Sequence, residues 1–388
     1  MTSYQRVKLS ELIFQTTTPE RITDMRNERY LTVSLYGKGV RERVIKDGKY
    51  PVPFTGYRVS EGQFIYSRID ARNGAYGIIG PELDGFVVSK DFPVYDIDAH
   101  RIIPQFLLMS VLGEGFLRQV KNSSFGATNR MRIKEEIMED YSILLPPLEE
   151  QSRIAENIGK VQSIIDLYLH QIQAFDRLIK ARFVEMFGLP GTDIHGWGLS
   201  PLGACCEINP KKGSDPRLAA GLQVSFVPMP AVSENGDIDA SDIKTYAEVK
   251  TGFTYFAEND VLFAKITPCM ENGKGAVAVG LTNGIGFGST EFHVVRPIAS
   301  KSNPYWLYTL MSFETFRKDA AANMTGSAGQ RRVPASFLER YMVALPPIRL
   351  QEKFATFVTQ VNKSKVAVQK ALDEAQLLFD SLMQEYFG

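Results

Sequence analysis

The residues best suited to catalysis are the carboxylates and lysine of one short segment. Asp242 is followed by Glu248-Val249-Lys250, and clustered carboxylates with a lysine can hold the divalent metal of a nuclease. Their spacing is short for such a site, and the group does not recur in the first half of the chain. The four histidines show no metal-ligand spacing, so we expect structural or surface roles for them. They are His100, His170, His195 and His293.

Two Pro-Pro pairs resemble part of another catalytic motif. Adenine methyltransferases grip a flipped base with Asn or Asp, two prolines and an aromatic residue. Here Leu145 and Leu345 precede the prolines, and leucine cannot accept a hydrogen bond from the exocyclic amine. The chain also lacks a G-x-x-x-x-G-K-[ST] phosphate loop. The sequence therefore predicts no catalytic and no metal-binding residues.

Polar loops carry the side chains that could read DNA. Arg and Lys bind guanine edges or phosphates, and Asn and Gln bind adenine. The segments "GATNRMR" and "GSAGQRR" combine these types with small residues that allow close approach of the backbone. We hypothesise DNA contacts for Arg68, Arg72, Asn73, Asn129, Arg130, Arg132, Lys265, Lys274, Ser289, Thr290, Gln330, Arg331 and Arg332. The alternative is that several of these charges are solvated or form ion pairs within a domain.

These loops belong to an internal repeat with an offset of 200 residues. "LPPLEEQSRI" from Leu145 returns as "LPPIRLQEKF" from Leu345, and "SKDF" returns as "STEF". Identical residues recur at this offset: Pro104, Leu107, Glu114, Phe116, Gly126, Arg132, Tyr141 and Phe187-Gly188 in the first copy. Further upstream the register drifts, and "YSRI" matches "FAKI", which places Arg68 near Lys265. A duplication explains the pattern. Recurrence of Arg132 as Arg332 favours a shared phosphate contact or structural role over base readout.

A long helical pattern follows each Pro-Pro pair. Apolar residues recur in alternating steps of four and three, which is typical of a coiled-coil seam. They include Ile154, Ile158, Val161, Ile165, Phe183, Phe354, Val358, Val361, Leu372 and Phe379. Only Lys365 interrupts the second stripe. We expect the two helices to pack on each other as rods of roughly 60 Å. The alternative is that each stripe is core of its own domain.

The segments between the helices favour mixed, strand-rich domains. Short apolar runs cut by Gly, Asn and Asp indicate strands and turns. We expect helices that begin after a proline at 104–121 and 304–319. A linker into the second half is expected at 187–197. The predicted fold is α+β, with two strand-rich domains separated by two long antiparallel coiled-coil helices in a pseudo-twofold repeat. The domain boundaries are 1–145, 146–188, 189–345 and 346–388.

Composition and charge further narrow the class of protein that this sequence can encode. The 388 residues are 44% hydrophobic, enough for ordinary cores. No apolar run is long enough to span a bilayer, and three cysteines cannot form a disulfide framework, so we expect a cytoplasmic protein. Net charge is zero, with 20 Lys/Arg against 18 Asp/Glu over 1–145 and 14 against 15 over 189–345. DNA binding would therefore require basic residues focused on one surface, or partners.

The chain resembles the specificity subunit of type I restriction–modification systems over essentially its whole length. The resemblance rests on the two proline phrases with their helices, on "SRIDARNGAYGIIGPELDGFVVSKDF" and its counterpart "ITPCMENGKG…GFGSTEF", and on "TGSAGQRRVPASFLERYMVALPP". One departure is that Glu149-Glu150 becomes Arg349-Leu350, so contacts of those carboxylates should differ between the copies.

The resemblance implies two target recognition domains on a spacer, each reading one half of a bipartite DNA sequence. It also implies two methylation subunits that bind S-adenosylmethionine and methylate adenine N6, and restriction subunits that cut DNA, while this chain is not itself an enzyme. Two alternatives remain: a coiled-coil scaffold whose globular parts bind protein, and a stand-alone nuclease or methyltransferase.

Overall fold

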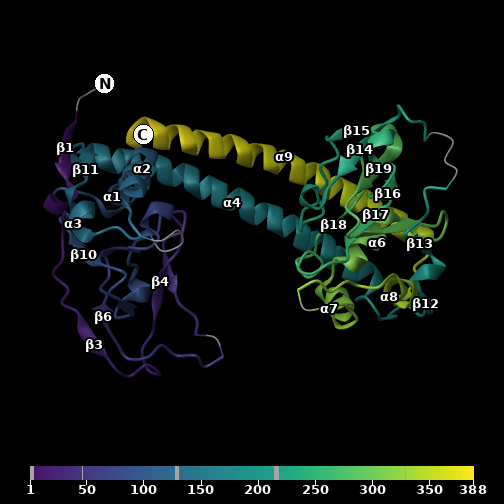
Figure 1. Cartoon of the computed structure of the whole chain (residues 1–388), viewed down its shortest axis with the longest axis horizontal. Helices are drawn as coiled ribbons and strands as arrows, with labels where there is room; N and C mark the ends of the chain where they lie inside the picture. Colours follow the sequence, from purple (N-terminus) through teal and green to yellow (C-terminus); the bar gives the residue numbers. More distant parts are fainter. Residues whose placement is uncertain (1–3, 46, 127–130, 214–217, 328) are drawn as a thin grey trace. The chain divides into compact units, whose positions relative to one another are not determined.

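The protein forms two compact units that each draw on both long helices. A computed structural model describes residues 4–45, 47–126, 131–213, 218–327 and 329–388. Unit 1 comprises Met1–Tyr168 and Ala371–Gly388, and unit 2 comprises Leu169–Lys370 (Figure 1). Within these described ranges, no helix is both long enough and apolar enough to cross a membrane.

Unit 1 is built on antiparallel sheets. Its four-stranded sheet has the order β2-β10-β7-β8, beside a three-stranded sheet β3-β6-β9 and the pairs β4-β5 and β1-β11. The strands are β1 Gln5–Lys8, β2 Ile13–Phe14, β3 Glu20–Ile22, β4 Leu31–Val33, β5 Val40–Glu42, β6 Phe54–Arg58, β7 Phe64–Tyr66, β8 Tyr76–Ile78, β9 Val87–Ser89, β10 Val94–Ile97 and β11 Ser142–Leu145. Short strands rich in Val, Ile, Phe and Tyr suit this half-buried arrangement.

Unit 2 repeats the central sheet. The order β13-β20-β17-β18 corresponds to β2-β10-β7-β8, and β12-β21 corresponds to β1-β11. Its other sheet, β15-β14-β19-β16, includes the parallel pair β14 and β19. The strands are β12 Leu199–Pro201, β13 Cys206–Ile208, β14 Gln223–Val227, β15 Ile243–Thr245, β16 Thr254–Ala257, β17 Val261–Ala264, β18 Gly275–Val277, β19 Ile285–Gly288, β20 Phe292–Pro297 and β21 Met342–Ala344. The predicted α+β repeat is confirmed.

The segments predicted as single helices at 104–121 and 304–319 are each two helices. In unit 1 the break is at Gly113, where an added Cβ would lie 2.6 Å from the carbonyl oxygen of Phe387. Phe387 at the end of α9 therefore leaves no room for a side chain at this position. The short helices are α1 Pro104–Leu112, α2 Glu114–Ser123, α3 Glu135–Asp140, α5 Tyr246–Val249, α6 Pro304–Met311, α7 Glu314–Ala322 and α8 Ala335–Arg340.

The long helices α4 (Leu148–Phe187) and α9 (Ile348–Phe387) contribute to both cores. In unit 1 the buried residues Ile154 and Ile158 of α4 share a core with Phe387 of α9. In unit 2 the aromatic ring of Phe183 lies 5.6 Å from that of Phe354. The two interpretations of the apolar stripes are thus combined: the helices pack on each other, and their ends complete the globular cores.

A buried glutamine anchors the start of each long helix. The Gln151 Oε1 accepts a hydrogen bond from the Ile103 amide at 2.9 Å, and its Nε2 donates to the carbonyls of Arg101 and Pro146 at 2.9 and 2.8 Å. Gln351 repeats this with the Asn303 amide and the carbonyls of Lys301 and Pro346 at 2.9, 3.0 and 2.8 Å. Both side chains are fully buried. These bonds explain why the phrase after Leu145 recurs after Leu345 with glutamine at the same place.

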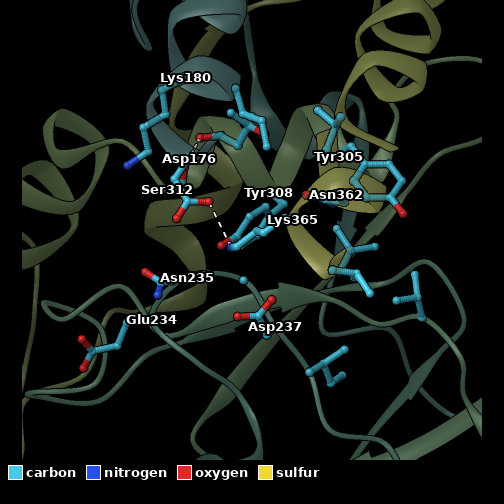
Figure 2. Close-up of a pocket in the computed structure, with 18 of the residues that line it drawn as sticks. Asp176, Lys180, Glu234, Asn235, Asp237, Tyr305, Tyr308, Ser312, Asn362 and Lys365 are labelled. Carbon is cyan, nitrogen blue, oxygen red and sulfur yellow. Dashed lines mark hydrogen bonds and ion pairs between the residues drawn. The ribbon is translucent and has the colours of Figure 1, made fainter. Parts of the chain in front are cut away.

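One ion pair distinguishes the seam of unit 2 from that of unit 1. Lys365, which interrupts the apolar stripe, donates to Asp176 of α4 at 3.1 Å, and both side chains face a cavity in unit 2 (Figure 2). The positions 200 residues away are Ile165, which is buried, and Gln376, which is exposed. A charged group in a seam is tolerated only with a partner or water, so Asp176 explains how Lys365 is accommodated.

We predict that Gln351→Ala lowers the free energy of unfolding by about 3 kcal/mol. The substitution leaves one buried amide and two carbonyls without a partner, and each such group costs about 1–3 kcal/mol. Urea denaturation followed by circular dichroism measures the change. Gln360→Ala, at an exposed position of the same helix, is the matched control and should change little. An equal effect of both substitutions would contradict the anchoring role.

We predict that Ile165→Asp destabilises unit 1 by about 3 kcal/mol, because a carboxylate would replace a side chain that is only 4% exposed and would lack a cation. Ile164→Asp is the control, because Ile164 is 44% exposed on the same helix. Hydrogen exchange of the unit 1 amides would report the difference. Normal protection in Ile165→Asp would show that the seam does not depend on this residue.

Candidate nucleic-acid interface

The same backbone frame positions the candidate residues of both units. In unit 1 the Arg68 amide donates to the Asp91 carbonyl at 2.9 Å, and the Arg68 carbonyl accepts from the Ile133 amide at 3.0 Å. In unit 2 the Lys265 amide donates to the Glu291 carbonyl, and the Lys265 carbonyl accepts from the Val333 amide, both at 2.9 Å. Arg68 and Lys265 are therefore structural equivalents, as the shifted register of the repeat predicts.

A reciprocal backbone pair closes the loop that carries each polar motif. Phe125 and Arg132 exchange hydrogen bonds of 2.9 and 2.7 Å, and Thr325 and Arg332 exchange bonds of 2.9 and 2.8 Å. Gly326 within the second loop has a φ of +119°, which residues with a side chain rarely adopt. Its added Cβ would lie 2.9 Å from the Gln330 carbonyl oxygen. Gly326 thus permits the backbone of the second loop to pass close to Gln330.

Acidic side chains hold the duplicated arginines. Arg332 donates from Nε and Nη2 to the two carboxylate oxygens of Glu291 at 2.9 and 2.8 Å. Arg132 makes the corresponding pair with Asp91 at 3.2 Å. Bidentate pairing fixes the guanidinium plane more firmly than a single hydrogen bond. The pairing is bidentate for Arg332, whereas Arg132 reaches Asp91 through Nη2 alone.

Two further candidates in unit 1 face protein partners. Arg68 forms an ion pair with Glu135 of α3, and Arg72 donates to the sulfur of Met131 at 2.9 Å. In each guanidinium the buried Nε has no hydrogen-bond partner among the described residues. Asn73 donates to the carboxylate of Asp70 at 3.3 Å. Asn129 and Arg130 lie outside the described residues.

The candidate residues of unit 2 differ in whether their side chains form hydrogen bonds within the protein or are exposed to solvent. Lys274 donates to the Met229 carbonyl at 3.3 Å, and the Ser289 hydroxyl accepts from the Glu291 amide at 3.2 Å. Thr290, Gln330 and Arg331 are exposed. Within the described part of the chain, Gln330 and Arg331 use only backbone atoms in their hydrogen bonds. The side chains of Gln330, Arg331 and Thr290 are therefore exposed and accessible to a ligand.

Burial and nearby charge shift the pKa values of two groups that contact Val333 in unit 2. Burial lowers the pKa of the Lys265 ammonium, although the nearby Glu291 carboxylate opposes this effect. Burial also lowers the pKa of His293, whose Nε2 donates to the Val333 carbonyl at 2.7 Å. His293 is thus held within unit 2 by this hydrogen bond, in agreement with the structural role expected for it.

Sequence reasoning missed the acids that orient the basic residues. Asp91 and Glu291 lie within the "SKDF" and "STEF" segments, where an acid recurs 200 residues later. That recurrence beside a recurring arginine was the available signal. For Glu135 no such signal existed, because its counterpart at the same offset is Ala335. Among the described residues, no group of three or more His, Cys, Asp or Glu could hold a metal ion.

Residues 195–375 match the family model described as the type I restriction modification DNA specificity domain. Over 194 residues the chain is 39% and 37% identical to two Escherichia coli proteins, the type I restriction enzyme EcoAI and EcoEI specificity subunits. Each match covers 48% of this chain and 32% of the relative, so the chain matches about a third of the length of these relatives. The resemblance noted in the sequence is confirmed.

Solved structures share the fold over the whole chain. One is the type I restriction-modification system S subunit from M. genitalium, with a TM-score of 0.53, 11% identity, and coverage of 99% of this chain and 96% of that one. Another, from a study of complex assembly and conformational transition of the type I R-M system, has a TM-score of 0.53 at 18% identity, with coverage of 100% and 98%.

We predict that acid weakens unit 2 through Glu291. The hydrogen bonds from Arg332 lower the pKa of the Glu291 carboxyl below its ordinary value of 4.5. Stability from this pair is therefore fully present above pH 4.5 and is lost as the pH falls through the lower folded-state pKa. Thermal melts between about pH 3 and 6 should show a shallower decline for Glu291→Gln than for the wild type. Glu339→Gln, at an exposed acid, should follow the wild type, and parallel curves for all three proteins would contradict the prediction.

Proposed function

We propose that this chain is the DNA-reading subunit of a type I restriction–modification complex, in which each unit reads one half of a bipartite target. The observation that carries this proposal is the duplicated closed loop. Its arginine is held by an acid in both units, and in unit 2 the adjacent Gln330 and Arg331 side chains are exposed. Glutamine and arginine are the side chains that recognise adenine and guanine edges.

The zero net charge supports assembly with other subunits. A protein that binds DNA alone by bulk charge usually carries a basic domain, and neither half of this chain does. Two methylation subunits that carry S-adenosylmethionine, joined by restriction subunits, would supply the missing affinity and the chemistry. The chain itself would position those subunits and would not be an enzyme. Its place of action would be the cytoplasm.

The domain assignment follows from this proposal. Residues 1–145 and 189–345 would be the two target recognition domains. Residues 146–188 and 346–388, which contain α4 and α9, would be the spacer. We divide the candidate residues of the interface by their surroundings. Arg132, Arg332 and Arg68 orient the loops through ion pairs, whereas Gln330 and Arg331 select bases.

We predict that Gln330→Ala or Arg331→Ala relaxes the preference for particular bases in one half-site and leaves the other half-site unchanged. Removal of one good side-chain pair to a base costs about 1–3 kcal/mol of discrimination. Sequencing of N6-methyladenine in a host that expresses the complex with each variant measures this. Lys363→Ala, at an exposed position of α9, should leave the split motif intact.

Three outcomes would count against the proposal. A wild-type complex that yields no methylated motif, or one contiguous short motif, contradicts the bipartite reading function. Equal weakening on all sequences in Gln330→Ala and Arg331→Ala contradicts base selection by these residues. Methylation or cleavage by the purified chain alone, with Mg²⁺ or S-adenosylmethionine, contradicts a non-catalytic role.

A further inference from the structure

A hairpin tip in unit 1 lies directly beside the candidate DNA-binding residues. Strands β4 and β5 pair from Leu31↔Glu42 to Val33↔Val40, and residues 34–39 form the tip. The Tyr36 amide donates to the Asn73 carbonyl at 2.8 Å, and the Gly37 amide donates to the Gly74 carbonyl at 2.9 Å. The tip is therefore fixed against the short helix η2 (Ala71–Asn73), which carries two of the candidate residues.

Tyr36 is presented to solvent at an energetic cost. Its φ is +58°, a left-handed conformation that costs a non-glycine residue about 1–2 kcal/mol. Its side chain is 75% exposed, so packing within the unit does not offset this cost. A glycine or asparagine would satisfy the same backbone more easily. A strained residue with an unburied aromatic ring indicates a role outside the folded unit.

Basic side chains surround the tip. Lys38, Arg41 and Arg43 are exposed, and none of them forms an ion pair with any acid that the structure describes. Glu42 is the one acid between Tyr36 and Arg43, so this segment carries a local charge of +2 from three basic residues and one acid. A focused positive patch with an exposed aromatic ring suits nucleic acid. Because the chain has no net charge, DNA binding requires basic residues focused on one surface, and this patch provides such a focus.

Unit 2 has a turn at the equivalent place, but its charged side chains are acidic. Val232 and Ile238 form a bridge, the Ser233 amide donates to the Asp237 carbonyl at 3.0 Å, and the Gly275 amide donates to the Ser233 carbonyl at 3.5 Å. This turn carries Glu234 and Asp237 and lines a cavity of about 560 Å³ with Lys180, Lys365 and Tyr308 (Figure 2). Acidic side chains at this place repel phosphates, so the feature belongs to unit 1 alone.

We propose that the hairpin tip of unit 1 binds the DNA backbone beside the half-site that unit 1 reads. This inference rests on the proposed function. Tyr36 packs its ring on the sugar and places its hydroxyl at a phosphate, while Lys38 and Arg41 neutralise phosphates. The tip adds affinity without base selection, because its side chains are not held in a geometry that matches a base edge. The two half-sites therefore differ in how much flanking duplex they need.

The test uses the chain assembled with its methylation subunits and duplexes that carry its mapped target. Tyr36→Asn is the decisive variant, because asparagine tolerates the left-handed backbone and the tip should keep its fold. We expect about tenfold weaker binding on every sequence at fixed salt, equivalent to one well-formed interaction. Trimming the flank of one half-site should weaken the wild type and leave Tyr36→Asn unchanged. Tyr36→Phe should retain part of the affinity.

The cations provide a second, independent readout. Lys38→Ala combined with Arg41→Ala should reduce the slope of log affinity against log salt by about 0.9 for each phosphate that is no longer neutralised. Asn235→Ala, at the equivalent turn of unit 2, is the matched control and should bind as the wild type does.

The outcomes separate this inference from the proposed function. Specific binding by the wild type with an unchanged affinity in Tyr36→Asn overturns the role of the tip alone. Failure of the wild-type complex to bind any target overturns both. Dissociation of the methylation subunits from Tyr36→Asn would mark the tip as a protein-docking surface and would also overturn the proposal.

Discussion

The architecture depends on one buried glutamine at the start of each long helix. Two prolines separate each long helix from the strand before it, and a proline has no amide with which to continue the backbone hydrogen bonds. Gln151 and Gln351 each join three backbone groups from separate segments. Because the side chains are fully buried, these bonds are protected from competition with water. Each helix is thereby fixed to the unit in which it begins, and its far end is free to complete the core of the other unit.

The candidate interface is likewise held in place by hydrogen bonds and ion pairs within each unit. Backbone bonds close each polar loop, and Glu291 or Asp91 holds the arginine at its end. The side chains of these arginines already form ion pairs within the protein, whereas those of Gln330 and Arg331 remain exposed. Recurring residues thus form the frame of the candidate interface, and under the proposed function the residues that differ between the units would select the sequence. Such a division would suit the proposed function, since two identical units would recognise two identical half-sites.

The duplicated copies differ in charge at two places beside the shared central sheet. Lys365 and Asp176 pair in unit 2, while unit 1 has Ile165 and Gln376 at the same positions. The tip beside Asn73 is basic and aromatic, and its counterpart in unit 2 is acidic. Neither difference alters the sheets, because both lie outside the apolar cores of the sheets. The central sheets β2-β10-β7-β8 and β13-β20-β17-β18 are therefore shared by the two copies, although charged residues near them differ.

Periodicity and repetition in the sequence determined the α+β class, the duplication, the long helices to within about two residues and the equivalence of Arg68 with Lys265. These follow from local patterns that each copy carries in full. Tertiary structure decided what those patterns do not contain: the break at Gly113 beside Phe387, the glutamine hydrogen bonds, and the acids that hold the loop arginines. Each of these joins residues distant in the chain, and the partner of a polar side chain depends on which groups the fold brings within about 3 Å.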